Sequence, residues 1–417
     1  MADRMGFAPD VEIRCKRFRI GCIGAGFIMA DVHLAAYADA GFPVIAIASR
    51  TRAKAEEVAK RRGIATVHDS PEALMADPRV EILDIAFPPD QQPGLMRAAL
   101  KQSHIKAILA QKPLAMDFAS AKALVAQAKA AGKVLSVNQN MRFDQSMRVL
   151  KQLLARGELG EPVLATIEMR AIPHWQSFLE SYGRLTLLNM SIHHLDVLRY
   201  LFGDPASITT IAHRDPRTSF AHKDGITVST LRFPSGLIAV SMEDVWAGPA
   251  REGGGSDIYI KWRVEGTDGL ARGTIGWPGY PARVPSTLDF TTRHHAGWQS
   301  PRWSEVWFPD AFVGTMSQLL CALEDDREPG ISGRDISKRL DVSFARLARI
   351  FKAEMGMSLV EYRNRARLDR FDVLLQKGHS NLLEAALAAG FGSYAQFHRV
   401  FRAIRRTTPS AYMRNRA

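Results

Sequence analysis

Two sets of side chains in the sequence have the types and the spacing to move a proton. Lys112 follows the apolar run 107–110, which predicts a buried strand. The carboxyl ends of parallel strands are where open α/β sheets bind ligands. Asn189, His193 and Asp196 are spaced i, i+4 and i+7, so they share one face of a helix. Oxidation of an alcohol needs a base for the hydroxyl proton, and a histidine or a lysine of lowered pKa can serve.

A glycine pair near the N-terminus predicts a phosphate-binding turn. Gly24-Ala25-Gly26 follows the run 18–23, which predicts the first strand, and a helical pattern comes next. Glycines let the backbone turn tightly and approach a pyrophosphate at the N-terminus of that helix. The third position of a G-x-G-x-x-G motif is Met29, so the motif is incomplete, but its place between strand and helix favours a dinucleotide site. An ordinary glycine turn is the alternative.

The end of the second predicted strand bears on the choice of cofactor. Ser49 and Arg50 follow the run 44–48. An acidic residue there would bind a ribose 2′-hydroxyl, whereas Ser and Arg suit a 2′-phosphate, so NADP is favoured and NAD is the alternative. The residues expected to bind the cofactor are Gly24, Gly26, Phe27, Ile28, Ser49, Arg50, Pro88, Gln111, Lys112 and Asn140.

The strands and helices that must position these residues are predicted to form two domains of different fold. Strands are predicted over 18–23, 44–48, 82–86, 107–110 and 134–137, with helices over 53–62 and 119–131. This alternation predicts an α/β fold with a doubly wound parallel sheet, the Rossmann arrangement. After residue 142 the pattern predicts helices over 146–156, 187–201 and 311–326, a strand over 163–170, and strand-like segments from 208 to 308. That series predicts a second, α+β domain with a mostly antiparallel sheet.

Composition limits the class of protein. The chain has 417 residues, of which 46% are hydrophobic and 24% charged, as is typical of a globular protein of several domains. No stretch approaches ~20 apolar residues and no apolar signal segment occurs near the N-terminus, so a cytoplasmic protein with no membrane partner is expected. The three scattered cysteines predict neither a disulfide framework nor a metal site. Residues 1–16 are expected to form a loose leader.

Charge is concentrated at the C-terminal end. Residues 331–417 contain 17 basic and 7 acidic residues, so they hold most of the formal net charge of +12. Apolar side chains recur there at helical spacing, which indicates a folded all-α module. A folded basic module is typical of a nucleic-acid binder, although charge alone is also consistent with a solvated surface.

The order of motifs over about residues 17–333 resembles the glucose–fructose oxidoreductase/inositol dehydrogenase (Gfo/Idh/MocA) family. The motifs are Gln111-Lys112-Pro113, Asn140-Met141-Arg142, and the helix with Asn189, His193 and Asp196. The resemblance implies that Lys112 is the catalytic lysine, that His193 accepts or donates a proton, and that Asp196 supports His193. Two positions depart from the family: Gln111 and Asn189 are amides where relatives have acids, and an amide cannot relay a proton as a carboxylate does.

His193 by itself is also consistent with a purely structural helix histidine, and His194, on another face, is expected to be structural. The segment with His174, Trp175 and Gln176 is expected to line a sugar or polyol pocket together with His193, or else to be a surface loop.

Residues 334–415 resemble the AraC/XylS-type double helix-turn-helix DNA-binding domain. The most specific segments read GFGSYAQFHRVFR (390–402) and TTPSAYMR (407–414). The resemblance implies double-stranded DNA as a partner, with bases contacted by Tyr394, Gln396, His398 and Arg399 in the second half and by Arg346 and Arg349 in the first half. Arg405 is expected to contact phosphates, and Arg406 stands where the motif usually has glycine.

Three interpretations follow from these features. The chain is an NAD(P)-dependent oxidoreductase with a DNA-binding domain, or a transcription regulator whose oxidoreductase-like body senses a sugar or cofactor without turnover, or an oxidoreductase whose tail mediates assembly. A homo-oligomer is expected. The predicted boundaries are 1–16 for the leader, 17–141 for the Rossmann domain, 142–331 for the α+β domain and 332–417 for the helix-turn-helix domain.

Overall fold

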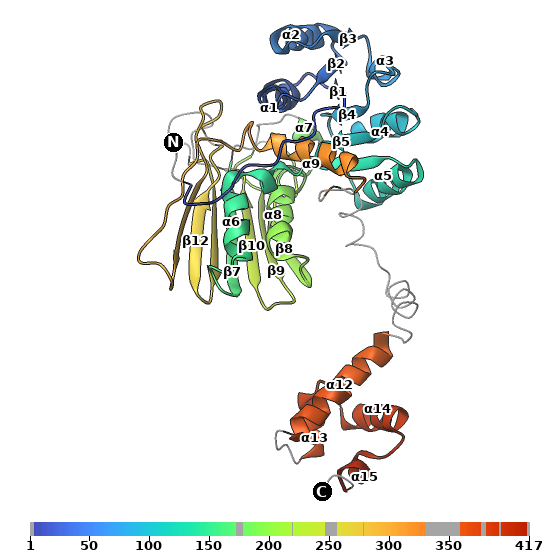
Figure 1. The fold of residues 1–417 in the computed structure, drawn as a ribbon, viewed down its shortest axis with the longest axis vertical. Coiled ribbons are helices and arrows are strands. Elements are labelled where there is room, and N and C mark those ends of the chain that lie inside the picture. Colours follow the sequence, from blue (N-terminus) through green and yellow to red (C-terminus); the bar gives the residue numbers. More distant parts are fainter. Residues whose placement is uncertain are drawn as a thin grey trace. The chain divides into compact units, whose positions relative to one another are not determined.

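The structure, a computed structural model, divides into two compact units, Met1–Ser337 and Lys338–Ala417. Each unit is described by itself (Figure 1). The residues that the structure describes are 4–171, 178–218, 220–246, 257–277, 279–327, 329, 359–376, 381–391 and 393–414.

The first unit begins with a six-stranded parallel sheet in the order β3-β2-β1-β4-β5-β6. Its strands are β1 (Ile20–Ile23), β2 (Val44–Ala48), β3 (Thr66–His68), β4 (Ile82–Ile85), β5 (Ala107–Ala110) and β6 (Val134–Val137). This order is that of a dinucleotide-binding Rossmann sheet, so the predicted fold class is confirmed for this domain. Five of the strands coincide with the predicted apolar runs. The sequence analysis missed β3, which has only three half-buried residues.

Helices cover both faces of this sheet. One hydrophobic cluster joins the strands to α1 (Leu34–Ala40), α2 (Arg52–Arg62) and α9 (Phe312–Glu324). The cluster on the other face contains residues of α3 (Pro71–Met75), α4 (Gln92–Leu100) and α5 (Phe118–Ala130). Helix α9 lies inside the range expected for the second domain, but it returns to the parallel sheet and contacts β5 and β6 (Figure 1).

The second sheet has seven strands in the order β13-β12-β11-β7-β10-β9-β8. They are β7 (Pro162–Arg170), β8 (Ser207–His213), β9 (Ile226–Arg232), β10 (Ile238–Asp244), β11 (Tyr259–Gly266), β12 (Gly269–Thr274) and β13 (Thr287–Thr292). The β7–β10 pair is parallel and the other pairs are antiparallel, so the predicted mostly antiparallel sheet is confirmed.

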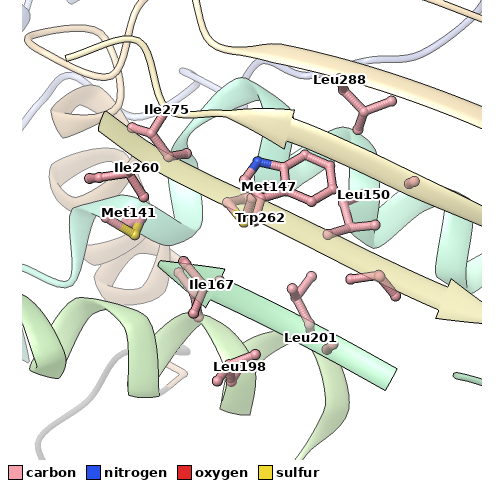
Figure 2. Close-up of a cluster of buried hydrophobic side chains, with 14 of the residues drawn as sticks. Met141, Met147, Leu150, Ile167, Leu198, Leu201, Ile260, Trp262, Ile275 and Leu288 are labelled. Atoms are coloured by element: carbon pink, nitrogen blue, oxygen red, sulfur yellow. The ribbon is translucent and has the colours of Figure 1, made fainter. Parts of the chain in front are cut away.

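Two helices pack on one face of this second sheet. They are α6 (Gln145–Ala155), which contacts β12 and β13, and α8 (Ile192–Phe202), which contacts β10. Figure 2 shows the core between them and the strands, where Leu150 of α6 and Leu198 of α8 join Ile167, Ile260 and Trp262 of the sheet. Three shorter elements complete the domain: η2 (Asn140–Phe143), α7 (Phe178–Tyr182) and the π-helical turn η3 (Leu187–Ser191).

The N-terminal segment is not a loose leader in the residues that are described. Phe7 packs in the core of the second domain, 6.0 Å from the Phe290 ring, and Cys15 is buried in the core of the first. Between them the side-chain amide of Gln152 binds both the N–H and the C=O of Ala8, at 3.2 and 2.7 Å. The segment therefore joins the two domains, which a charged and irregular sequence did not reveal.

The second unit contains four described helices: α12 (Leu359–Gln376), α13 (Leu382–Ala388), α14 (Tyr394–Arg405) and α15 (Pro409–Arg414). They pack around Phe371, Phe397 and Phe401, each fully buried. Ser393 begins α14 by accepting a hydrogen bond from the Gln396 N–H at 3.2 Å. The all-α prediction is confirmed for this part. No helix in the described ranges of the chain is both long and apolar enough to span a bilayer.

Candidate functional site

The glycine turn after β1 has the geometry that the motif predicts. Gly24 has a φ of +123°, and a Cβ at this position would meet the Ala86 carbonyl oxygen at 2.6 Å. Only glycine fits there without a shift of the backbone. A Cβ on Gly26 would meet no atom within 4 Å, so this glycine borders open space. The π-helical turn η1 (Ile28–His33) follows directly and leads into α1.

A cavity of about 330 Å³ lies beside this turn. It is reached by loops that follow β1, β4, β5 and β6, the carboxyl edge of the parallel sheet. Its wall includes the predicted residues Gly26, Phe27, Ile28, Pro88, Gln111, Lys112, Asn140, Asn189 and His193. The structure thus brings residues from both domains to one place.

Lys112 is held by Asn189. Its Nζ donates to the Asn189 backbone carbonyl at 2.7 Å and to the side-chain Oδ1 at 3.2 Å. Burial of the amine lowers the pKa of Lys112 to about 7. The amine and the ammonium forms are therefore both accessible near neutral pH, which is the property required of a proton-transfer group.

His193 lies on the same cavity with its side chain nearly fully buried. Burial, reinforced by the neighbouring Lys112 and His194, holds the pKa of His193 well below its ordinary value. The imidazole is thus neutral at pH 7. Its ring lies edge-on to Trp307 at 5.7 Å, and its Nδ1 has no hydrogen-bond partner. His194 faces away and pairs with the buried carboxylate of Glu243 at 2.9 Å.

Asp196, expected to support His193, is paired with Arg142. Its two carboxylate oxygens accept hydrogen bonds from the guanidinium group of Arg142, and both side chains are buried. Because Nδ1 of His193 has no partner, the carboxylate does not hold that atom. The pair instead ties α8 to η2, next to Asn140 of the cavity wall.

Three predicted cofactor residues lie outside the cavity wall. They are Gly24, Ser49 and Arg50. Arg50 is exposed; it donates to Gln91 Oε1 at 2.9 Å and lies 5.4 Å above the ring of Phe87, which does line the cavity. Its guanidinium is therefore placed at the rim.

Sequence reasoning missed the aromatic part of the wall. Trp277, Trp307, Phe308 and Phe312 line the cavity together with Leu188 and Met190. Trp307 Nε1 donates to Asn140 Oδ1 at 2.9 Å, which joins this wall to the predicted Asn-x-Arg motif. No spacing in the sequence connects tryptophans in the loops after β12 and β13 with the parallel sheet.

Among the expected substrate residues, His174, Trp175 and Gln176 lie outside the described residues.

The surface of α14 carries a basic stripe. Arg399 and Arg402 are exposed and share one side of the helix, opposite the buried Phe397, and the exposed Arg406 follows at the C-terminal end of the helix. Tyr394, Gln396 and His398 are half-buried beside this stripe.

Arg405, expected to contact phosphates, is exposed and also has a partner within the unit. Its guanidinium pairs with Asp372 of α12 at 2.6 Å, so Arg405 ties two helices together. The sequence analysis overlooked Arg402, which is exposed on the stripe. Arg346 and Arg349 lie outside the described residues.

Comparison with known proteins identifies all three parts. Residues 18–139 match the model of the oxidoreductase family with an NAD-binding Rossmann fold, and residues 147–272 match the GFO/IDH/MocA C-terminal domain. The chain belongs to the Gfo/Idh/MocA oxidoreductase family. Residues 336–415 match a helix-turn-helix domain, so this Gfo/Idh/MocA oxidoreductase carries the DNA-binding type of domain that the sequence predicted.

Relatives of this Gfo/Idh/MocA protein are moderately similar. A D-apiose dehydrogenase of Paraburkholderia graminis is 27% identical over 78% of this chain and 85% of its own length. A 1,5-anhydro-D-fructose reductase of Ensifer adhaerens is 29% identical over 53% of this chain and 67% of its own length.

Solved structures share the fold of the oxidoreductase part. An oxidoreductase from Agrobacterium radiobacter, in complex with NAD+, L-tartaric acid and magnesium, superposes with a TM-score of 0.65 and 22% identity. The match covers 82% of this chain and 98% of that one. A levoglucosan dehydrogenase in complex with NADH and L-sorbose gives a TM-score of 0.63 at 20% identity, over 78% and 94% of the two chains.

Proposed function

We propose that the protein is an NADP-dependent dehydrogenase that oxidises a secondary alcohol of a sugar or polyol and also binds specific DNA through α14. The observation that carries the enzymatic part is that a lysine of lowered pKa and a neutral histidine share one cavity beside a glycine turn. The names of the relatives, which include sugar dehydrogenases and a Myo-inositol 2-dehydrogenase of Thermotoga maritima, support the class of substrate.

The residues fit a dinucleotide. The Gly24 position leaves no room for a side chain, while Gly26 borders open space, as a turn that receives a pyrophosphate requires. Ser49 and Arg50 would hold a 2′-phosphate, and the wall formed by Ile28, Pro88 and Gln111 would hold the nicotinamide end. When bound, the cofactor supplies the hydride acceptor.

Lys112 is proposed to take the hydroxyl proton. A neutral amine has two N–H groups and one lone pair. If both N–H groups donate to the two oxygens of Asn189, the lone pair faces away from Asn189 and is available to the substrate hydroxyl. Asn189 then has a function that an amide can fulfil: it orients the amine, although it cannot relay a proton.

His193 is proposed to orient the substrate. An imidazole whose pKa lies well below its ordinary value stays neutral, and so offers one donor and one acceptor nitrogen. Its neutrality also leaves Lys112 as the group that changes charge near pH 7. Asp196 and Arg142 are proposed to fix the start of α8 on which His193 stands.

The DNA-binding part rests on α14. Arg399 and Arg402 extend from the exposed face of a helix whose other face is buried in an aromatic core, the arrangement by which a second helix of a helix-turn-helix enters a major groove. We propose that Arg399, Gln396, His398 and Tyr394 contact bases, because they lie in the first half of the helix, and that Arg402 contacts phosphate.

Two substitutions separate these roles. Replacing Arg399 with Ala should cost about 1–3 kcal/mol and relax one base preference, whereas Arg402→Ala should weaken binding to all duplexes alike. Both are measured by fluorescence anisotropy on selected and scrambled duplexes. Equal losses of affinity on both duplexes for Arg399→Ala would contradict base contact.

One screen tests the enzymatic proposal. The full chain is incubated with NADP or NAD and a panel of sugars and polyols, and reduced cofactor is followed by absorbance. Turnover with NADP over NAD supports the proposal. Binding of NADPH by thermal shift without turnover on any alcohol would favour a non-catalytic sensor instead.

A homo-oligomer stays a prediction. Light scattering of the purified chain measures the mass of the assembly in solution.

A further inference from the structure

His33 lies at the centre of a buried polar network beneath the cavity. It stands in η1, is fully buried, and its Nδ1 is 2.7 Å from Oδ2 of Asp84. Asp84 is itself fully buried within β4. The Tyr37 hydroxyl donates to the same oxygen at 2.6 Å, and burial raises the pKa of Tyr37, so the hydroxyl keeps its proton. Oδ2 of Asp84 therefore accepts hydrogen bonds from the Tyr37 hydroxyl and from Nδ1 of His33, which carries a hydrogen.

The other ring nitrogen faces two side-chain amides. Nε2 of His33 is 2.8 Å from Nδ2 of Asn138 and 3.4 Å from Nε2 of Gln111. The orientation of the Gln111 amide is fixed because its Oε1 accepts the Lys112 backbone N–H at 2.9 Å. The NH2 group of Gln111 must then point at His33, so Nε2 of His33 accepts a hydrogen bond from this amide through its lone pair.

These bonds form a continuous chain from β4 to the proposed base. It runs from Asp84 through His33 to the Gln111 amide and on to the backbone N–H of Lys112. The loop is held from its other side by Gln92, whose Nε2 donates to the carbonyls of Gln111 and Pro113 at 2.7 and 2.6 Å. Gln92 fixes the backbone path, while His33 fixes the Gln111 side chain.

We propose that Asp84 and His33 are positioning residues for Lys112, and that they act by holding the imidazole as an acceptor for the Gln111 amide. The kinetic part of this inference rests on the proposed function. The network also accounts for an amide at position 111. A carboxylate there would face the lone pair of Nε2, and the two could come together only if the imidazole gained a proton.

The first test compares two ways of removing a hydrogen bond from the same carboxylate. Asp84→Asn keeps the shape of the side chain but loses the charged acceptor that fixes the tautomer of His33. Tyr37→Phe removes a bond to the same Oδ2 and leaves His33 in place. We expect kcat to fall about 10- to 100-fold in Asp84→Asn, with KM for NADP within about twofold, and to change little in Tyr37→Phe.

A rescue experiment distinguishes positioning from mere stability. In Asp84→Asn combined with Gln111→Glu, the carboxylate stands at the other end of the imidazole. Nε2 of His33 then donates to the new carboxylate at position 111, and Nδ1 accepts a hydrogen bond from the new amide at position 84. The same groups stay connected, but every hydrogen bond in the series runs in the opposite direction. Asn138 can follow, because its Oδ1 has no hydrogen-bond partner. We expect the double variant to recover at least about tenfold in kcat over Asp84→Asn, compared at the plateau of each pH profile.

A second readout needs no turnover. Acylation of Lys112 is followed by peptide mass spectrometry as a function of pH, with the exposed Lys101 as internal reference. We expect the labelling midpoint of Lys112 to rise in Asp84→Asn and to stay in place in Tyr37→Phe. This arm is informative even if the wild-type chain oxidises none of the alcohols, a result that would count against the proposed function alone.

Three results would overturn the inference. The first is a folded Asp84→Asn variant whose Lys112 labelling midpoint and kcat are both unchanged. The second is an equal loss of kcat in Asp84→Asn and Tyr37→Phe, and the third is a double variant whose kcat is no higher than that of Asp84→Asn. If Asp84→Asn does not fold, Gln111→Met carries the test, because position 111 is half-buried at the cavity wall. An unchanged labelling midpoint in Gln111→Met would equally overturn it.

Discussion

Lys112 and Arg399 are both basic side chains at proposed functional sites, but they differ in how far their charged groups are exposed to solvent. Burial lowers the pKa of Lys112 to about 7, and its amine is bound by two oxygens of Asn189. Arg399 is exposed on α14 among other arginines. The first site depends on a cation that can lose its charge in a desolvated cavity, the second on cations that keep their charge in solvent. pH and salt should therefore act on different sites of the same chain.

The largest effect is expected from removing the buried amine. Lys112→Met should lower kcat for alcohol oxidation by about 10²- to 10⁴-fold, because general-base catalysis contributes on that scale. Lys112→Arg is the matched control, since it keeps a positive charge that cannot be removed. Both variants should bind NADPH in a thermal-shift assay and bind DNA like the wild type. A kcat within tenfold of wild type in Lys112→Met would contradict the role of Lys112 as base.

Salt should affect the exposed site far more than the buried one. If the helix-turn-helix unit neutralises ~5–8 phosphates, log K for DNA falls against log salt with a slope of about −5 to −7, so affinity drops about 10³-fold or more between 50 and 200 mM salt. Turnover with a neutral sugar should change by less than about twofold over that range, because buried groups are weakly screened. Anisotropy and steady-state rates measure the two. A flat salt dependence of DNA binding would reject the nucleic-acid interface.

The pH dependence should differ between the two sites. Alcohol oxidation needs the neutral amine of Lys112, so kcat should rise with pH through about 7 and then level, being about tenfold below its plateau at pH 6. Because the pKa of His193 lies well below its ordinary value, His193 adds no second limb near neutrality. Reduction of the carbonyl, measured with NADPH, should show the opposite slope. DNA affinity, carried by arginines, should be nearly constant from pH 7 to 9. A kcat that is constant from pH 6 to 8 would contradict this account.

The smallest expected effect concerns a backbone conformation in the exposed unit. Arg406 follows α14 with a φ of +54°, a left-handed conformation that favours glycine. Arg406→Gly should raise the free energy of unfolding of this unit by about 0.5–1 kcal/mol, as measured by urea denaturation. Arg402→Gly is the control, and should be destabilising because it lies within the helix. Since Arg406 belongs to the basic stripe, its loss should also weaken DNA binding slightly.

The sequence predicted the elements whose signal is local. Continuous apolar runs marked β2, β5 and β6 at the bounds that the structure has, because strands buried on both faces contain almost only apolar residues. The cavity residues Lys112, Asn189 and His193 were predicted together because the order of their motifs resembles a known family. These predictions needed either a pattern of a few residues or a familiar motif.

What the sequence did not predict depends on pairings between distant residues. Asp84 lies within an apolar strand, and only the fold brings it against His33, 51 residues away in the chain. The ion pair between Arg405 and Asp372 joins residues 33 positions apart, and nothing in the sequence links them. The aromatic wall around His193 comes from loops far along the chain. Each case is decided by tertiary packing, which carries no local periodicity.

The aromatic wall has a practical consequence. Trp277 and Trp307 lie at the cavity itself, and the indole ring of Trp307 is 5.7 Å from the His193 ring. Indole fluorescence responds to the polarity around the ring and transfers energy to a nearby reduced nicotinamide. The protein therefore contains its own optical probes, and occupancy of the cavity can be titrated on the unlabelled chain, with Trp277→Phe and Trp307→Phe as the variants that reduce the signal.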